Sequence, residues 1–255
     1  MPEFTVLEWV LLSAYGLLVG VSKAGIPGVG ILGVVLILTL MGGRIPPKQA
    51  VGFMLPLLIA GDICAVIYYR RLAMWRTLLR LTPWAAAGIV IGWRILAMIE
   101  GVEGSNELFQ RLLGGIVLGL LALDLWRNTR TREPDIPSQW WVAGAVGLLA
   151  GVTTMLSNAA GPLIVIYFAA MRFEKQKFIG TAAWYFLLLN SFKIPFFLDL
   201  DMIRFDLFER SLFLVPAIVA GAALGIIALK RIPQKWFVIA VKGLAAAGAA
   251  KLILW

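Results

Sequence analysis

Two short segments of the chain place hydroxyl, amide and lysine side chains beside glycine and proline. In the first segment, Ser22 and Lys23 come just before Gly25 and Pro27. A helix that restarts at Pro27 would direct free backbone N–H groups and its positive dipole end toward this joint. With an added ammonium and hydroxyl group, the joint is suited to hold a small anion. The alternative is that Lys23 is an interfacial charge at the tip of a hairpin.

The second segment has the same construction without a fixed charge. Its hydroxyl and amide groups are followed by Gly161 and Pro162, which restart a helix. These polar residues are Thr153, Thr154, Ser157 and Asn158. We expect binding to involve mostly Asn158 and the backbone around it. The alternative is that these small polar side chains cap a broken helix or join neighbouring helices.

Three further polar residues lie inside apolar runs, where an ionisable group is costly and therefore indicates function. Lys193 is the basic residue deepest in any run, and Asn190 precedes it by three positions. The alternative for Lys193 is that its head group extends toward the outer membrane interface. Asp62 is the only acidic residue well inside a run. It is a candidate proton-coupling group or, alternatively, a structural ion-pair partner of a buried lysine.

Membrane helices must position these residues. The chain has 255 residues, of which 61% are hydrophobic and 15% charged, and its mean hydropathy is +0.90. Soluble domains are usually about 45–50% apolar and about 25% charged, and one helix needs about 20 residues to cross a bilayer. The apolar runs are 4–21, 27–42, 47–69, 78–98, 108–126, 139–154, 160–171, 178–198, 207–229 and 236–254.

Composition also excludes several classes of site. The chain has no histidine and a single cysteine, Cys64, so it has no His-ligated metal, no Ser–His catalytic site and no internal disulfide. It has no P-loop pattern, which argues against ATP-driven transport by this chain. We expect no cofactor, no metal and no enzymatic activity. The net charge of +9 is assigned to cytoplasmic loops and not to nucleic-acid binding.

Loop charges predict how the chain crosses the membrane. The loops around Arg71, Arg130 and Lys235 are basic, whereas those around Glu103 and Asp201 are acidic. Basic loops on the inside place both termini outside, provided that each short pair of runs enters and leaves on one side. Re-entrant hairpins and tilted full spans meet this condition equally. The 43–48 loop then falls outside and is a basic exception.

The two halves of the chain resemble each other at an offset of about 128–133 residues. Asp62 aligns with Asn190, and each half contains five apolar runs. The other matches pair 16–21 with 147–152, Arg44 and Gly52 with Arg172 and Gly180, and Pro83, Gly88 and Gly92 with Pro216, Gly221 and Gly225. An odd number of segments inverts the second half relative to the first, an arrangement typical of secondary transporters.

The predicted fold is therefore an all-α integral membrane protein made of two inverted repeats of five membrane segments. The first two segments of each half are short and joined by a break that contains Gly and Pro. Residues 1–128 form the first repeat, 129–137 a cytoplasmic linker and 138–255 the second, inverted repeat.

The segments Ser22-Lys23-Ala24-Gly25-Ile26-Pro27-Gly28-Val29-Gly30 and Thr153 to Pro162 resemble the signatures of the TauE/SafE family of sulfite and sulfonate exporters. So do the segment 178–182 and the Asn190-Ser191-Phe192-Lys193 segment. The resemblance covers essentially the whole chain. It implies a multi-pass carrier of the bacterial cytoplasmic membrane that exports sulfite or small organosulfonates. Many members have a first joint richer in glycine, where this chain has Lys23 and Pro27.

We therefore expect a secondary transporter for a small anion, working by alternating access around a midplane site. The expected substrate-binding residues are Ser22, Lys23, Gly25, Thr153, Thr154, Ser157, Asn158, Asn190 and Lys193. The rival readings are a transporter or channel for a cation or neutral solute, and a non-transporting membrane scaffold. An intramembrane enzyme is disfavoured by the lack of histidine and of a carboxylate pair. The expected partners are the anion and the lipid bilayer; a homo-oligomer is compatible with the sequence.

Overall fold

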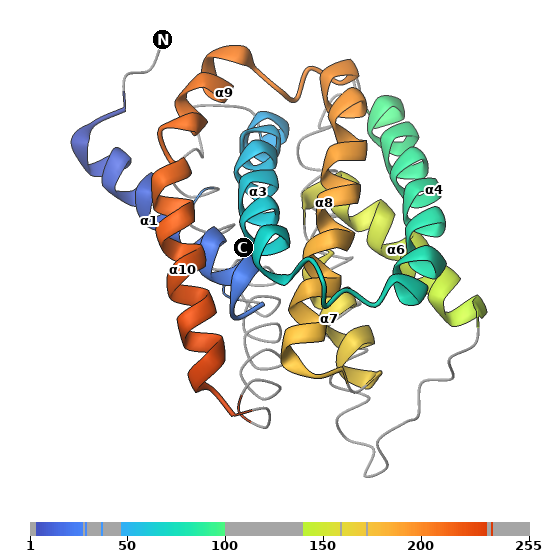
Figure 1. The fold of residues 1–255 in the computed structure, drawn as a ribbon. Coiled ribbons are helices and arrows are strands. Elements are labelled where there is room, and N and C mark those ends of the chain that lie inside the picture. Colours follow the sequence, from blue (N-terminus) through green and yellow to red (C-terminus); the bar gives the residue numbers. More distant parts are fainter. Residues whose placement is uncertain are drawn as a thin grey trace.

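The computed structural model describes residues 4–27, 29, 37, 47–99, 140–158, 160–171, 173–233 and 236. Within these ranges the ordered elements are α-helices, and no strand is found (Figure 1). The helices are α1 (Val6–Ala24), α3 (Pro47–Tyr69), α4 (Trp75–Ile99), α6 (Trp140–Ser157), α7 (Gly161–Ala170), α8 (Lys175–Asp199), α9 (Phe205–Leu212) and α10 (Val215–Arg231).

Five of these helices are long and apolar enough to cross a membrane: α1, α3, α4, α6 and α8. Helices α9 and α10 qualify together as a sixth span that is bent by 51°. The prediction of a multi-pass helical membrane protein is thus confirmed. The predicted runs 27–42, 108–126 and 236–254 lie outside the described residues, apart from isolated positions.

Helices α1 and α6 continue further along the chain than their apolar runs indicated. Ser22 and Lys23 belong to the last turn of α1, and Gly25 caps it by donating its N–H to the carbonyl of Val21. In α6, the hydroxyls of Thr153 and Ser157 donate to the carbonyls four residues earlier, at 2.6 and 3.1 Å. Such bonds let hydroxyl residues stay helical inside an apolar environment. The predicted joint residues therefore lie on helix ends.

Glycines let two pairs of helices pack backbone against backbone, α1 on α10 and α6 on α4 (Figure 1). A Cβ atom at Gly20 would collide with the carbonyl of Ile218 on α10, and one at Gly151 with that of Ala85 on α4. The reverse contacts exist too, because a Cβ at Gly221 or Gly88 would strike the carbonyls of Leu17 and Leu148, respectively. Small residues are the usual means of close helix approach in membranes.

Hydrogen bonds join the basic turn after α3, the first part of α8 and the end of α10. The hydroxyl of Thr181, near the start of α8, accepts a 3.0 Å bond from the backbone N–H of Met74, which follows the basic turn after α3. Lys175 donates from Nζ to the carbonyls of Leu229 and Ile232 at the end of α10, at 2.7 and 2.6 Å. The turn after α3, the first part of α8 and the end of α10 therefore lie close together.

The acidic connection after α8 lies at the opposite end of the bundle. The indole N–H of Trp93, late in α4, donates to Asp199 Oδ2 at 2.8 Å. Lys48, at the start of α3, donates from Nζ to the carbonyl of Leu200 at 3.2 Å. The basic exception noted in the sequence thus lies beside the acidic loop. The central parts of α3 and α8 lie between these two ends.

Candidate functional site

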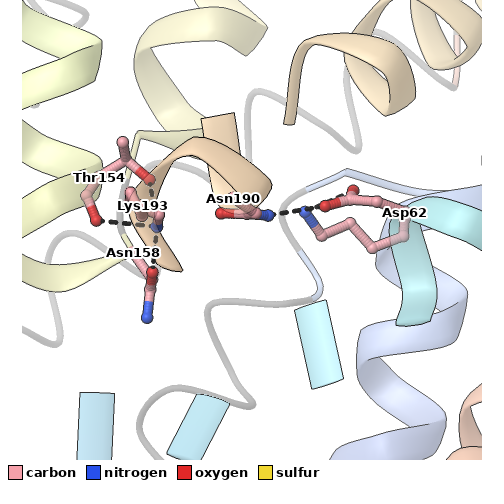
Figure 2. Close-up of polar contacts among 6 residues, drawn as sticks. Asp62, Thr154, Asn158, Asn190 and Lys193 are labelled. Carbon is pink, nitrogen blue, oxygen red and sulfur yellow. Dashed lines mark hydrogen bonds and ion pairs between the residues drawn. The ribbon is translucent and has the colours of Figure 1, made fainter. Parts of the chain in front are cut away.

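Helices α3 and α8 bring Asp62 and Asn190 into contact inside the bundle (Figure 2). Asn190 donates from Nδ2 to Asp62 Oδ2 at 2.7 Å. Both side chains are buried, with Asp62 0% exposed. A buried carboxylate is stable only when it is paired and hydrogen-bonded. The amide of Asn190 satisfies one of the two carboxylate oxygens.

The other carboxylate oxygen faces Lys23. Lys23 Nζ lies 2.8 Å from Asp62 Oδ1, and the lysine side chain is 14% exposed. The same ammonium group lies 4.5 Å from the centre of the Phe186 ring on α8, within the range of a cation–π contact. Lys23, Asp62 and Asn190 form what we call the carboxylate cluster, which connects the end of α1 with α3 and α8.

Lys193 forms a second cluster at the end of α6. Its Nζ donates to Thr154 at two atoms, the backbone carbonyl at 3.1 Å and Oγ1 at 3.0 Å, and to Asn158 Oδ1 at 2.6 Å (Figure 2). The side chain is 0% exposed and does not extend to the outer interface as the alternative reading proposed. A helix C-terminus favours a cation because its carbonyls and dipole are negative. Lys193, Thr154 and Asn158 are called the lysine cluster below.

Asn158 holds the end of α6 in place. Its backbone has φ 56°, the left-handed conformation in which a helix commonly ends and which asparagine tolerates better than most residues. While Oδ1 accepts from Lys193, Nδ2 donates to the carbonyl of Val51 on α3 at 3.0 Å. One amide side chain therefore connects three elements, α3, the end of α6 and α8.

Among the described residues, the remaining predicted binding residues make no side-chain hydrogen bond or ion pair with either cluster. The hydroxyls of Thr153 and Ser157 are used inside α6, as described above. Ser22 is half-buried on the last turn of α1. Gly25 packs so closely on Gly225 of α10 that a Cβ atom would collide with its backbone. These residues shape the two helix ends, whereas the polar contacts are made by Lys23, Asp62, Thr154, Asn158, Asn190 and Lys193.

Sequence reasoning missed three groups that complete the site. Tyr69 donates its hydroxyl to the carbonyl of Ala24 at 3.0 Å, which holds the end of α1 against α3. Phe186 supplies the aromatic face beside Lys23, and Val51 supplies the carbonyl that orients Asn158. An aromatic residue and a backbone carbonyl carry no distinctive pattern in an apolar run. Tyr69 alone carries a weak signal in the sequence, because it places a phenol hydroxyl at the end of the predicted run 47–69.

The two clusters differ in net charge. In the carboxylate cluster, one ammonium and one carboxylate compensate each other. In the lysine cluster, the contacts of Lys193 among the described residues are to uncharged acceptors. Asn190 and Lys193 are three positions apart on α8, so the clusters share one helix face. Together the two clusters contain two lysines and one aspartate among the described residues.

The donor set does not resemble a metal centre. In the part of the chain that the structure describes, no group of three or more His, Cys, Asp or Glu residues is placed to hold a metal ion. The site instead offers ammonium and amide N–H groups and a hydroxyl, which are the groups that bind oxyanions.

Comparison with known proteins identifies the family. No curated protein and no solved structure matches this chain. The model of the family described as "Sulfite exporter TauE/SafE" matches residues 12–252, nearly the whole chain and all of the clusters above. The chain belongs to the TauE/SafE family of sulfite exporters, which are membrane transporters and not enzymes.

Proposed function

We propose that this protein exports sulfite or an organosulfonate across the bacterial inner membrane, and that the anion binds at Lys193. The proposal rests on the lysine cluster, in which a fully buried ammonium group meets only uncharged acceptors among the described residues. A buried charge without a counter-ion is costly, and an arriving anion relieves that cost. Family membership supports the class of cargo.

The oxygens of a sulfite or sulfonate group would take the place of the present acceptors around Lys193. Thr154 and Asn158 reach Lys193 with a hydroxyl and an amide, and both groups also carry hydrogens to donate. Asn190 lies on the same face of α8 as Lys193. Charge-assisted hydrogen bonds from an ammonium to an oxyanion are about twice as strong as neutral ones. We propose Lys193, Thr154, Asn158 and Asn190 as the binding residues.

Transport would proceed by alternating access between two inverted repeats, residues 1–128 and 138–255, joined by the linker 129–137. The matched glycine contacts support this, because α1 packs on α10 as α6 packs on α4. Each contact joins the first helix of one half to the late helix of the other. Rocking of one half against the other would open a buried site first to one side and then to the other.

The membrane potential can drive this export. A potential that is negative inside favours the exit of an anion by about 2.3 kcal/mol per charge per 100 mV. With the basic connections in the cytoplasm, as proposed, the start of α3 and the end of α8 face outward together with both termini. Lys193, six residues before the end of α8, then lies toward the outer side of the membrane.

Flux in proteoliposomes tests this proposal. Saturable efflux of sulfite or of a small sulfonate is expected from the wild-type protein, and a Lys193→Met variant should lose it by at least about 100-fold, as expected for a buried charge contact. Lys177→Met is the matched control, because Lys177 lies on the same helix, is 44% exposed and pairs with Glu174. Equal flux through both variants, or no anion flux through folded wild-type protein, would overturn the proposal.

A further inference from the structure

The contacts of Lys193 can be made by a protonated ammonium group, and we take Lys193 in that form. Nζ donates to three separate acceptor atoms, at 2.6, 3.0 and 3.1 Å. A protonated lysine has three hydrogens to donate and no lone pair to offer. The contact of 2.6 Å to Asn158 is also as short as bonds from charged donors are. A protonated Lys193 would donate in all three contacts and place one positive charge in the interior of the bundle.

The carboxylate cluster contributes no net charge, because Lys23 and Asp62 form a close pair. Asn190 connects this pair to the lysine cluster, since it donates to Asp62 and lies one helical turn before Lys193. The described charged residues of the two clusters are thus two lysines and one aspartate. Their charges sum to +1 at the place where the anion is proposed to bind.

From this sum we infer that the transporter selects a monovalent anion, and that Asp62 sets this selectivity by neutralising Lys23. The inference rests on the proposed function and names its substrate class: a sulfonate with an otherwise uncharged body, or hydrogensulfite. A monovalent anion leaves the buried site neutral. A divalent anion leaves one negative charge uncompensated inside the membrane, where charge is costly.

Asp62 is therefore a specificity-determining residue that need not touch the substrate. Replacement of Asp62 by asparagine keeps the side-chain shape and an oxygen that accepts from Asn190. It removes the negative charge that balances Lys23 and raises the charge of the two clusters to +2. The altered site should then favour a divalent anion. A further Lys23→Met replacement returns the sum to +1 and should restore the original preference.

The experiment compares two ligands of the same shape and different charge. Sulfoacetamide carries one negative charge, whereas sulfoacetate carries two, and they differ only by an amide in place of a carboxylate. Binding of each is measured calorimetrically at one fixed neutral pH to detergent-purified wild type, Asp62→Asn and Lys23→Met/Asp62→Asn. Size-exclusion profiles and thermal unfolding check that each variant is folded.

The wild type is expected to bind the monovalent ligand at least about 10-fold more tightly, given the strength of charge interactions at short range in proteins. Asp62→Asn should shift the affinity ratio toward sulfoacetate by about 10-fold or more, and the double variant should reverse that shift. A wild type that binds both ligands equally overturns the inference, even if Asp62→Asn does not fold. The inference is also overturned if the ratio of the affinities for sulfoacetamide and sulfoacetate is the same in all folded variants. If folded wild type binds neither ligand, the proposed function itself fails.

Discussion

Asn190 donates a 2.7 Å hydrogen bond to Asp62 across a sequence separation of 128 residues. These two residues are also the ones that the internal sequence match places at equivalent positions of the two halves. In an arrangement related by a two-fold axis, residues near the axis meet their own counterparts. The contact therefore supports the proposal that such an axis passes between α3 and α8, close to the substrate site.

The pairing of Lys23 with Asp62 predicts strongly non-additive effects on stability. Lys23→Met should cost about 3–5 kcal/mol, because it leaves a fully buried carboxylate without a cation. Asp62→Asn should cost less, since Lys23 is 14% exposed and its ammonium can turn toward water. The double variant should be more stable than the sum of the single losses indicates, by about 1 kcal/mol or more. Unfolding by denaturing detergent in mixed micelles measures all three values; strictly additive losses would contradict the pairing.

Sequence reasoning located the main elements because membrane spans have a strong pattern. The predicted run 47–69 coincides with α3, and 160–171 contains α7. It also selected Lys193 and Asp62, since ionisable residues in apolar runs are rare. It could not decide which lysine meets Asp62, because an apolar pattern carries no distances between helices. The structure assigns Lys23 to the carboxylate and gives Lys193 uncharged neighbours.

The sequence also could not place the helix ends. The sequence places Thr153 and Ser157 in a joint between two helices, because Gly161 and Pro162 follow them. In the bundle their hydroxyls bond to carbonyls of the same helix, and α6 runs on to Ser157. The left-handed backbone of Asn158 then ends it. Hydroxyl-to-carbonyl bonds of this kind form more readily where no water competes for the hydroxyl. The residue types alone do not show whether water reaches these positions.

The close packing of α6 on α4 predicts a sharp difference between two glycines. Gly151→Ala should destabilise the protein by roughly 1–3 kcal/mol, because its Cβ would collide with the carbonyl of Ala85. Gly161→Ala is the matched control, since a Cβ at Gly161 would meet nothing within 4 Å. Gly151 lies in the interior of α6, where alanine gains helix propensity over glycine, so a loss of stability at Gly151 would come from packing and not from propensity. Thermal unfolding in detergent measures it, and equal stability of the two variants would refute the packing.

The proposed orientation predicts which loops reagents can reach from outside. In a Cys64→Ser background, Glu209→Cys on α9 should react with a membrane-impermeant maleimide in intact cells. Arg71→Cys, in the basic turn after α3, should react only after the cells are opened, because basic loops stay in the cytoplasm. Both side chains are exposed, so neither position is protected by packing. The reverse labelling pattern would invert the proposed topology.

Asn158 offers a way to neutralise Lys193 in place. In Asn158→Asp, a carboxylate oxygen replaces the amide oxygen that now lies 2.6 Å from Lys193 Nζ. The new ion pair should occupy the ammonium permanently and reduce sulfonate flux by about 10-fold or more, since a bound anion would then bring uncompensated charge. The loss of the Nδ2 bond to Val51 is a separate effect of the same change.

Asn158→Gly separates these two effects. Glycine adopts φ 56° without strain and also removes the bond to Val51, but it adds no negative charge. We therefore expect Asn158→Gly to bind sulfoacetamide more tightly than Asn158→Asp, because Lys193 keeps its charge free for the ligand. Calorimetric titration of both variants measures this difference. Equal affinities would show that the amide acts through its contact with Val51 alone, and would remove Lys193 charge compensation as the basis of anion binding.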